Sequence, residues 1–504
     1  MKLIPFHFKP EKIIFSLLFF MAACLFILRG MLASSYLPET GGVSINVMYG
    51  IERILNDQPL YTNPEEPPFP IIQYMPLYFN LIKNICIVTG NRHDVHGMMV
   101  ISRWFCLLMD VLSVIVIART LINTLRVSSI ISWTLSFIYF VSIPGIIYGR
   151  VDNLYLLLFI TTVSILLKSL YSTDKSRFSE RYAVELSGAT TALALLTKQT
   201  AIFLAIFCFI YLLFIGKNYK SLLRYCLSCG IVFLAFFLLM LPDSLMHFKL
   251  NVIDGVKNGL NINWFSEVIL KNFFLKFSYL IATGLLVSYY LLKENKHVAF
   301  LFVGIGIVWF FLEATLSSFK AGSGPNYYLE FIFMMIVGIG ILIRHAAIHP
   351  EKYFLFALAI SPFFLIASAN DKGWGDTGLM KKSRTDYFNT REVVAYVLPK
   401  VKADEWVLTN FHKESTINLQ LSDKALFPCR EVALYFTRPL GVFHFNKFNE
   451  LLNQHKISFI IDRKNKFPET FLDVELKNYV ADTTIGNYTI YKLADRSVTS
   501  GFAN

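Results

Sequence analysis

The chain has 504 residues, of which 55% are hydrophobic, 15% are aromatic and only 16% are charged. Soluble globular domains carry about 25% charged residues, so the composition excludes an ordinary soluble protein and predicts a polytopic membrane protein. The formal net charge of +12 does not indicate nucleic-acid binding, because Lys and Arg lie in short clusters between apolar runs, as the positive-inside rule expects.

Apolar runs long enough to cross a bilayer follow one another to about residue 370. They lie near 13–33, 98–122, 128–148, 154–170, 184–200, 201–216, 225–242, 273–292, 297–317, 327–344 and 352–369. The first run follows Lys2, Lys9 and Lys12 and shows no obvious small-residue cleavage site, so we interpret it as a retained anchor. The expected fold class is an α-helical polytopic membrane protein with about eleven transmembrane helices.

A long loop, 34–97, separates the first apolar run from the second, and it is acidic and rich in aromatic residues and Pro. Within it, the run 76–89 is short and contains Lys83 and Asn84. If this run does not cross and the N-terminus is cytoplasmic, the basic clusters fall in short cytoplasmic loops; if it crossed, the bias would reverse. We therefore interpret 76–89 as an interfacial helix with Pro76 in its first turn, which places the 34–97 loop outside.

The composition changes after about residue 370 and becomes charged and mixed. Helix-like stretches at 391–400 and 446–455 alternate with strand-like stretches at 406–409, 457–461 and 488–492. This alternation predicts a small α/β domain. We therefore divide the chain into a transmembrane domain, 1–370, and a C-terminal domain on the outer side, 371–504.

Carboxylates on the outer side are candidate general bases, because they can accept a proton from a sugar or lipid hydroxyl. The first outer loop offers Glu39, Glu52 and Asp57. Glu39 precedes the pair Gly41–Gly42, which lets backbone approach closely, whereas Glu52 and Asp57 are also explained as solvated loop acids. Asp152 precedes a span and is either a helix N-cap or a second acid of an outer site.

Two cations are candidates for binding an anionic group. Arg150 could hold a phosphate in a bidentate way or anchor the chain at the interface. Lys198 lies between two apolar runs, where an ammonium is expensive to bury, and it either snorkels to the interface or binds an anion. Arg103 and Asp110 share one span, and we expect them to form a structural pair.

Glu330 lies about one turn inside a span that follows a glycine-rich turn, and an acid at that depth is a functional candidate by default. The seven cysteines show no disulfide framework and no zinc-binding pattern. We therefore assign no metal ligands.

Taken in chain order, these parts form a recognisable series. One span precedes a long outer loop, and the motifs that follow are Gln58–Tyr61, Tyr74–Tyr78, Arg150–Asp152, Thr197–Gln199 and Asn326–Glu330. Together with the C-terminal α/β domain, the series resembles the GT-C superfamily of membrane glycosyltransferases. The resemblance is to the bacterial branch that includes the protein mannosyltransferases and the lipid A aminoarabinose transferase.

The resemblance implies a hexosyl- or pentosyltransferase of a bacterial inner membrane. It would pass a sugar from a polyprenyl-phosphate donor to a lipid or cell-surface glycan acceptor on the periplasmic side. The loop acid of the family would fall near Val43–Ser44, where this chain has none, so the resemblance leaves Glu39 or Asp152 as the catalytic residue.

The resemblance also assigns binding roles. Lys198 and Arg150 would bind the donor phosphate. The residues expected to bind substrate are Tyr61, Tyr74, Tyr78, Gln199, Asn326 and Glu330. No cofactor is implied with certainty, and a divalent metal stays open. The expected partners are the donor, the acceptor and membrane lipids, and nucleic acid is not among them.

Two alternatives share many of these features. A transporter or flippase of lipid-linked sugars would also need spans and intramembrane charges, but the sequence shows neither inverted repeats nor midplane helix breaks. An outer α/β domain is also unusual for a transporter. A glycan polymerase uses the same donor chemistry and stays open.

Overall fold

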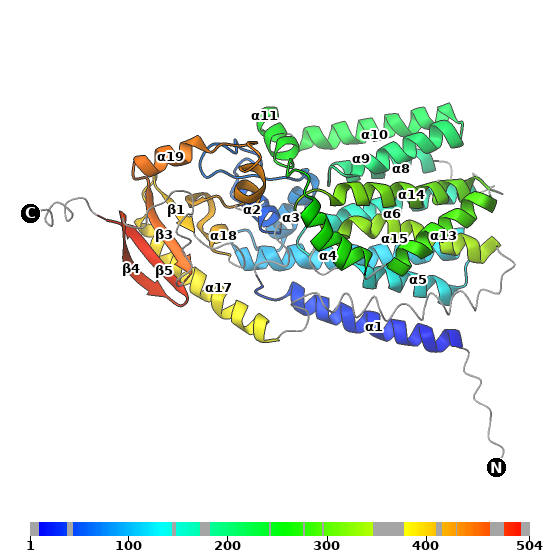
Figure 1. Ribbon diagram of the computed structural model, residues 1–504, viewed down its shortest axis with the longest axis horizontal. Helices are drawn as coiled ribbons and strands as arrows, with labels where there is room; N and C mark the ends of the chain where they lie inside the picture. The colour runs from blue at the N-terminus through cyan, green and yellow to red at the C-terminus, as the bar shows by residue number, and fades with distance from the viewer. Residues whose placement is uncertain are drawn as a thin grey trace, which may run out of the picture.

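The structure is a computed structural model, and it describes most of the chain. The described residues are 10–37, 44–143, 148–171, 182–240, 243–275, 278–294, 297–345, 377–409, 416–429, 431–463 and 478–494. A bundle of helices makes up most of the molecule, and a small sheet lies at one end of it (Figure 1). The helical fold with a C-terminal sheet is thus the one that the sequence predicts.

The bundle contains long helices and several shorter ones. The α-helices are α1 (Pro10–Ala33), α4 (Val95–Arg119), α5 (Ser129–Ser142), α6 (Asp152–Tyr171), α8 (Ala183–Leu195), α9 (Ala201–Ile210), α10 (Tyr219–Leu239), α13 (Ser278–Glu294), α14 (Val298–Ser318) and α15 (Leu329–His345). The π-helical and 3-10 segments beside them are η1 (Thr120–Thr124), η3 (Tyr211–Ile215), η5 (Phe265–Phe274) and η6 (Pro325–Tyr328).

Within the described residues, six helical segments are long and apolar enough to cross a membrane. They are Phe15–Ala33, Val95–Thr124, Asp152–Tyr171, Tyr219–Leu239, Val298–Ser318 and Pro325–His345. Shorter apolar helices occupy the expected spans near 128–148, 184–200 and 201–216. The expected span at 352–369 lies outside the described residues, so the total of about eleven spans stays a prediction.

Exposed apolar side chains on the bundle fit a lipid environment. On α10, Leu223, Leu227, Ile231 and Leu234 are each at least half exposed. In water such a row of leucine and isoleucine would be unfavourable, whereas lipid tails accept it. The chain is therefore a membrane protein.

Between the bundle and the sheet lie the helices α2 (Ser44–Leu55) and α3 (Leu77–Val88) of the 34–97 loop (Figure 1). Pro76 precedes α3, as the sequence predicts. With 12 residues, α3 is about 18 Å long and is shorter than the hydrocarbon core of about 30 Å. Its Tyr78, Phe79 and Ile82 are buried. This length fits the interfacial interpretation of 76–89, which stays a prediction because α5 and α8 are nearly as short.

One polar pairing expected from the sequence is wrong. Asp110 does not pair with Arg103, because its carboxylate lies 3.8 Å from the Arg29 guanidinium and accepts hydrogen bonds from Tyr148 (2.8 Å) and Asn153 (2.7 Å). Arg103 donates instead to the backbone carbonyls of the segment that follows α1. Periodicity within one helix cannot reveal that a partner on another helix lies closer.

The C-terminal part folds around a five-stranded sheet with strand order β2-β1-β3-β5-β4. The strands are β1 (Trp406–Thr409), β2 (Ala425–Leu426), β3 (Ile457–Arg463), β4 (Tyr479–Ile485) and β5 (Tyr488–Leu493). β1 pairs in parallel with β2 and β3, and β5 pairs antiparallel with β3 and β4. The expected strands at 406–409, 457–461 and 488–492 are present, whereas β2 and β4 were not predicted.

Helices accompany this sheet. They are α17 (Thr377–Val397), η7 (Leu398–Lys400), α18 (Ile417–Leu421), η8 (Ser422–Lys424), η9 (Glu431–Thr437) and α19 (Asn446–Asn453). Three short segments follow α10 in the chain: α11 (Leu245–Lys249), η4 (Leu250–Asp254) and α12 (Ile262–Trp264).

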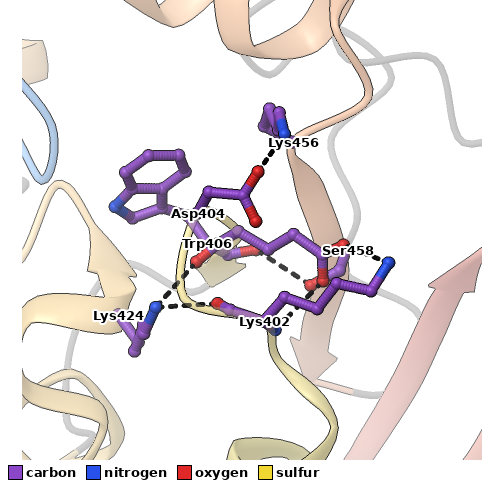
Figure 2. Close-up of polar contacts among 7 residues, drawn as sticks. Lys402, Asp404, Trp406, Lys424, Lys456 and Ser458 are labelled. Carbon is purple, nitrogen blue, oxygen red and sulfur yellow. Dashed lines mark hydrogen bonds and ion pairs between the residues drawn. The ribbon is translucent and has the colours of Figure 1, made fainter.

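Figure 2 shows how η8 is fixed beside β1. The Lys424 ammonium donates to the carbonyls of Lys402 and Ala403, each at 2.8 Å, and Lys456 forms an ion pair with Asp404. These contacts hold the turn that enters the sheet, and they fix Asp423, the neighbour of Lys424. Asp423 in turn binds the bundle side of the molecule, since it lies 2.6 Å from Arg53 of α2.

Candidate active site

A buried carboxylate, that of Asp152, lies at the centre of the candidate site. It opens α6, and its Oδ1 atom is 2.9 Å from the Lys198 ammonium and accepts a 2.9 Å hydrogen bond from the Asn326 amide. Lys198 lies in the turn between α8 and α9, and Asn326 lies in η6. Three motifs that are far apart in sequence therefore meet at one point.

Arg150 extends this cluster on the other side of Asp152. Its Nε atom lies 3.7 Å from Oδ2 of Asp152, which is within ion-pair range but too long for a hydrogen bond. Neither atom has a hydrogen-bond partner among the described residues, although both are buried. Tyr74 interacts electrostatically with Arg150. Buried polar atoms of this kind are usually satisfied, so the pair offers one donor and one acceptor to a ligand.

Aromatic rings surround the Lys198 ammonium. It lies 4.9 Å from the ring centroid of Tyr327 and 5.3 Å from that of Tyr155. Both distances allow cation–π attraction. The ammonium is therefore held inside the protein, with a carboxylate and two rings as neighbours, and it does not extend along the surface.

Two further carboxyl groups lie near Lys198. Glu330 of α15 and Glu313 of α14 are both buried, and each feels the Lys198 charge. The Oε2 atom of Glu330 has no hydrogen-bond partner among the described residues, and Ser317 donates to Glu313 at 3.2 Å. Sequence reasoning identified Glu330 and missed Glu313, although an acid inside the apolar run 297–317 is the same kind of signal.

A further cation near the site, Lys320, was not predicted from the sequence. It follows α14 in a turn whose backbone pairs with Leu260. Burial, and in the same direction the nearby charge of Lys198, lower the pKa of Lys320 to about 8. In the sequence, Lys320 looks like an ordinary solvated lysine of a glycine-rich loop. Only the fold shows that it lies near Lys198.

Three of the predicted substrate-binding residues lie around the site and form hydrogen bonds to the segments that surround it. The Tyr61 hydroxyl donates to the carbonyl of Tyr74 at 2.7 Å, and the Gln199 amide donates to the carbonyls of Gln73 and Val252. Tyr78 is hydrogen-bonded to Ser102 at 2.7 Å, between α3 and α4. The structure places Tyr61 and Gln199 against the segment that carries Tyr74, and Tyr78 in a helix contact.

The acids of the 34–97 loop occupy different environments. Glu39 lies outside the described residues. Glu52 is only 7% exposed, so it is not a solvated loop acid, whereas Asp57 is largely exposed and pairs with Arg92. The described part of the chain contains no group of three or more His, Cys, Asp or Glu residues arranged to hold a metal ion.

No protein-family model matches the chain, and no curated protein matches it by sequence. Solved structures do match. ArnT from Cupriavidus metallidurans, bound to undecaprenyl phosphate, is similar with a TM-score of 0.61 and 10% identity, over 94% of this chain and 98% of that chain.

Two archaeal structures also match. The oligosaccharyltransferase of Archaeoglobus fulgidus, in complex with Zn and sulfate, gives a TM-score of 0.54 at 11% identity, over 93% of this chain and 73% of that one. AglB from the same organism, in complex with an inhibitory peptide and a dolichol-phosphate, gives 0.51 at 11% identity, over 88% and 69%. Identities this low establish a shared fold and no more: the chain has the fold of these ArnT and oligosaccharyltransferase structures, as the resemblance noted in the sequence led us to expect.

Proposed function

We propose that the chain transfers a sugar from a polyprenyl-phosphate donor to a lipid or cell-surface glycan acceptor. The observation that carries this proposal is the buried cluster of Arg150, Asp152 and Lys198, which leaves Nε of Arg150 and Oδ2 of Asp152 without hydrogen bonds to the described residues. Two buried cations beside one acid suit a reaction in which a phosphate group leaves. The lipid phosphates bound by the structural neighbours support the same donor class.

In the proposed reaction the acceptor hydroxyl oxygen bonds to C1 of the sugar while the bond from C1 to the phosphate oxygen breaks. The electron pair leaves with the polyprenyl phosphate, and attack from the opposite face inverts C1. Lys198 and Arg150 would stabilise the phosphate charge that develops as the bond breaks. These two side chains are already held in place before substrate arrives, which lowers the cost of reorganisation.

The hydroxyl proton would pass to a carboxylate. Oδ2 of Asp152 is the acceptor that the described residues offer at the centre of the cluster, and Glu39 is the alternative in the outer loop. Tyr74, Asn326 and Glu330 would complete the substrate contacts. Tyr61 and Gln199 would contribute by holding the Tyr74 segment.

A direct assay tests the reaction. The purified protein is incubated in detergent with synthetic polyprenyl-phosphate sugars and a lipid extract, and free polyprenyl phosphate and glycosylated product are followed by mass spectrometry. A transferase releases both. A flippase would move the donor between leaflets without breaking the C1–oxygen bond, and a polymerase would give products with several added units. No release of polyprenyl phosphate from any donor would contradict the proposal.

We also propose that the site and the C-terminal domain face the periplasm of a bacterial inner membrane, with a cytoplasmic N-terminus. The charge bias of the loops supports this orientation. It can be tested with His93→Cys in the outer loop and Lys220→Cys at the start of α10, both at exposed positions. A membrane-impermeant maleimide should label His93→Cys in intact spheroplasts and Lys220→Cys only after permeabilisation. The reverse pattern would contradict the proposed orientation.

A further inference from the structure

The first outer loop contributes residues to the core of the C-terminal domain. Phe69 and Ile71 are fully buried in a cluster whose other members come from residues 408–460. The Phe69 ring stacks on Phe427 with centroids 4.8 Å apart, and it meets Phe445 edge-on at 5.7 Å. This loop segment therefore packs into the domain as an internal part of its core.

Hydrogen bonds from two backbone amides of the C-terminal domain fix the same junction. The Phe427 amide donates to the carbonyl of Pro68 at 2.8 Å, and the amide of His444 donates to the Glu65 carboxylate at 2.8 Å. Burial of a whole aromatic ring next to such a hydrogen bond leaves the loop little freedom to slide. The position of Phe69 is set by the C-terminal domain.

From Phe69 the chain runs directly to the candidate site. The Ile71 carbonyl accepts from Asn46 at 2.6 Å, the Ile72 backbone amide donates to the Asn251 side chain at 2.8 Å, and the Gln73 side-chain amide donates to the Gly255 carbonyl at 2.6 Å. Asn46 belongs to α2, whereas Asn251 lies in η4 and Gly255 directly follows it, so the segment is held from two sides. Five residues after Phe69 comes Tyr74, the partner of Arg150.

We infer that Phe69 is a positioning residue: by locking the outer loop into the C-terminal domain, it sets where Tyr74 lies against Arg150. The role of Tyr74 in turnover rests on the proposed function, whereas the mechanical link between Phe69 and the Tyr74 segment does not. The domain would thus act on the reaction through this loop, without touching the reacting atoms.

The test compares Phe69→Ala, Phe69→Leu and the control Phe443→Ala in the full chain. Phe443 is buried in the same cluster, but its ring contact is with Phe445. Hydrogen exchange is read over residues 70–77, in which all but Pro70 and Pro76 carry an exchangeable backbone amide, and transfer is read as separate kcat and KM values. A misplacement of about 1 Å can cost about a hundredfold in rate.

We expect Phe69→Ala to speed exchange at 70–77 while β1 and β3 stay protected, and to lower kcat about a hundredfold. Phe69→Leu should keep both the slow exchange at 70–77 and kcat close to the wild-type values. Phe443→Ala should leave exchange at 70–77 unchanged. Unchanged exchange in Phe69→Ala, or an equal effect of Phe443→Ala, would overturn the inference. If the wild-type protein transfers no sugar, the proposed function fails, and the exchange comparison still decides the link.

Discussion

Asp152 and Lys198 form a buried ion pair 2.9 Å long between the start of α6 and the turn that joins α8 to α9. Both side chains are less than 10% exposed. Burying two charges costs desolvation free energy that burying two apolar side chains of similar size does not. A buried ion pair is therefore weak evidence that the contact stabilises the fold. Its position among Arg150, Asn326 and Tyr327 is better explained by a role of the two charges in binding substrate.

The first prediction concerns the Lys198 charge. Lys198→Ala should lower kcat about a hundred- to a thousandfold, the range for loss of one preorganised donor. Lys198→Arg should keep part of the activity, because the charge remains while its geometry changes. Activity is measured as release of polyprenyl phosphate by the purified variants.

The matched control is Lys257→Ala, which removes a lysine from an exposed pair with Asp254 at 2.6 Å. Exposed pairs contribute at most about 1 kcal/mol, so this variant should behave like the wild type. Normal transfer by Lys198→Ala would show that the buried pair is structural and would remove Lys198 from the site.

The second prediction separates the acids. Asp152→Asn or Glu39→Gln should lower turnover about a hundred- to ten-thousandfold, because the amide keeps the shape and loses proton acceptance. Glu52→Gln and Asp57→Asn should stay within about tenfold of the wild type, since a role in proton transfer would cost more than that. Donor binding, measured separately, should be largely kept in all four variants. If Glu52 or Asp57 proves essential while Asp152 and Glu39 tolerate the amide, the base has been assigned to the wrong residue.

The third prediction concerns the pH dependence of donor affinity. Because the pKa of Lys320 is lowered to about 8, its ammonium is charged below that pH and loses its charge as the pH rises through it. A donor phosphodiester keeps its own charge across this range. The KM for the donor should therefore rise about fivefold between pH 7 and pH 9, because one charge worth about 1.4 kcal/mol changes it about tenfold in total and most of that change falls between these pH values.

Two variants check that the step belongs to Lys320. Lys320→Arg stays protonated and should show a flat profile, whereas Lys320→Met should show the raised KM already at pH 7. A step near pH 8 that persists in both variants would assign the titration to another group.

The sequence predicted the helices and most of the candidate site, because both leave local signals. Apolar runs indicate spans, and charged residues such as Arg150, Asp152 and Lys198 are conspicuous inside or between such runs. The contacts that the sequence could not predict join distant elements. Arg29 pairs with Asp110 across helices, and Phe69 lies in the core of a domain more than 300 residues away in sequence. Nothing in the loop around Phe69 distinguishes it from an ordinary Pro-rich turn.

The last prediction concerns Glu52, which links α2 to the C-terminal domain. Its side chain is buried, and burial raises its pKa to about 7, while hydrogen bonds from Ser422 and Asn56 and the charge of Arg53 oppose this rise and Asp423 adds to it. Below about pH 4.5 the carboxyl group is protonated in both folded and unfolded chains. Between about 4.5 and 7 only the folded chain keeps the proton, so stability falls as the pH rises through this window and then stays level.

Glu52→Gln cannot ionise and should lack this loss, which amounts to on the order of 3 kcal/mol at pH 8. The difference in thermal midpoint between Glu52→Gln and the wild type should therefore grow in favour of the variant from pH 5 to pH 7.5. Asp57→Asn, an exposed acid of the same loop, serves as the control and should show no such growth. A difference that does not change with pH would mean that Glu52 is already ionised in the folded protein at pH 5, and the contact between α2 and η8 would then hold a charged carboxylate.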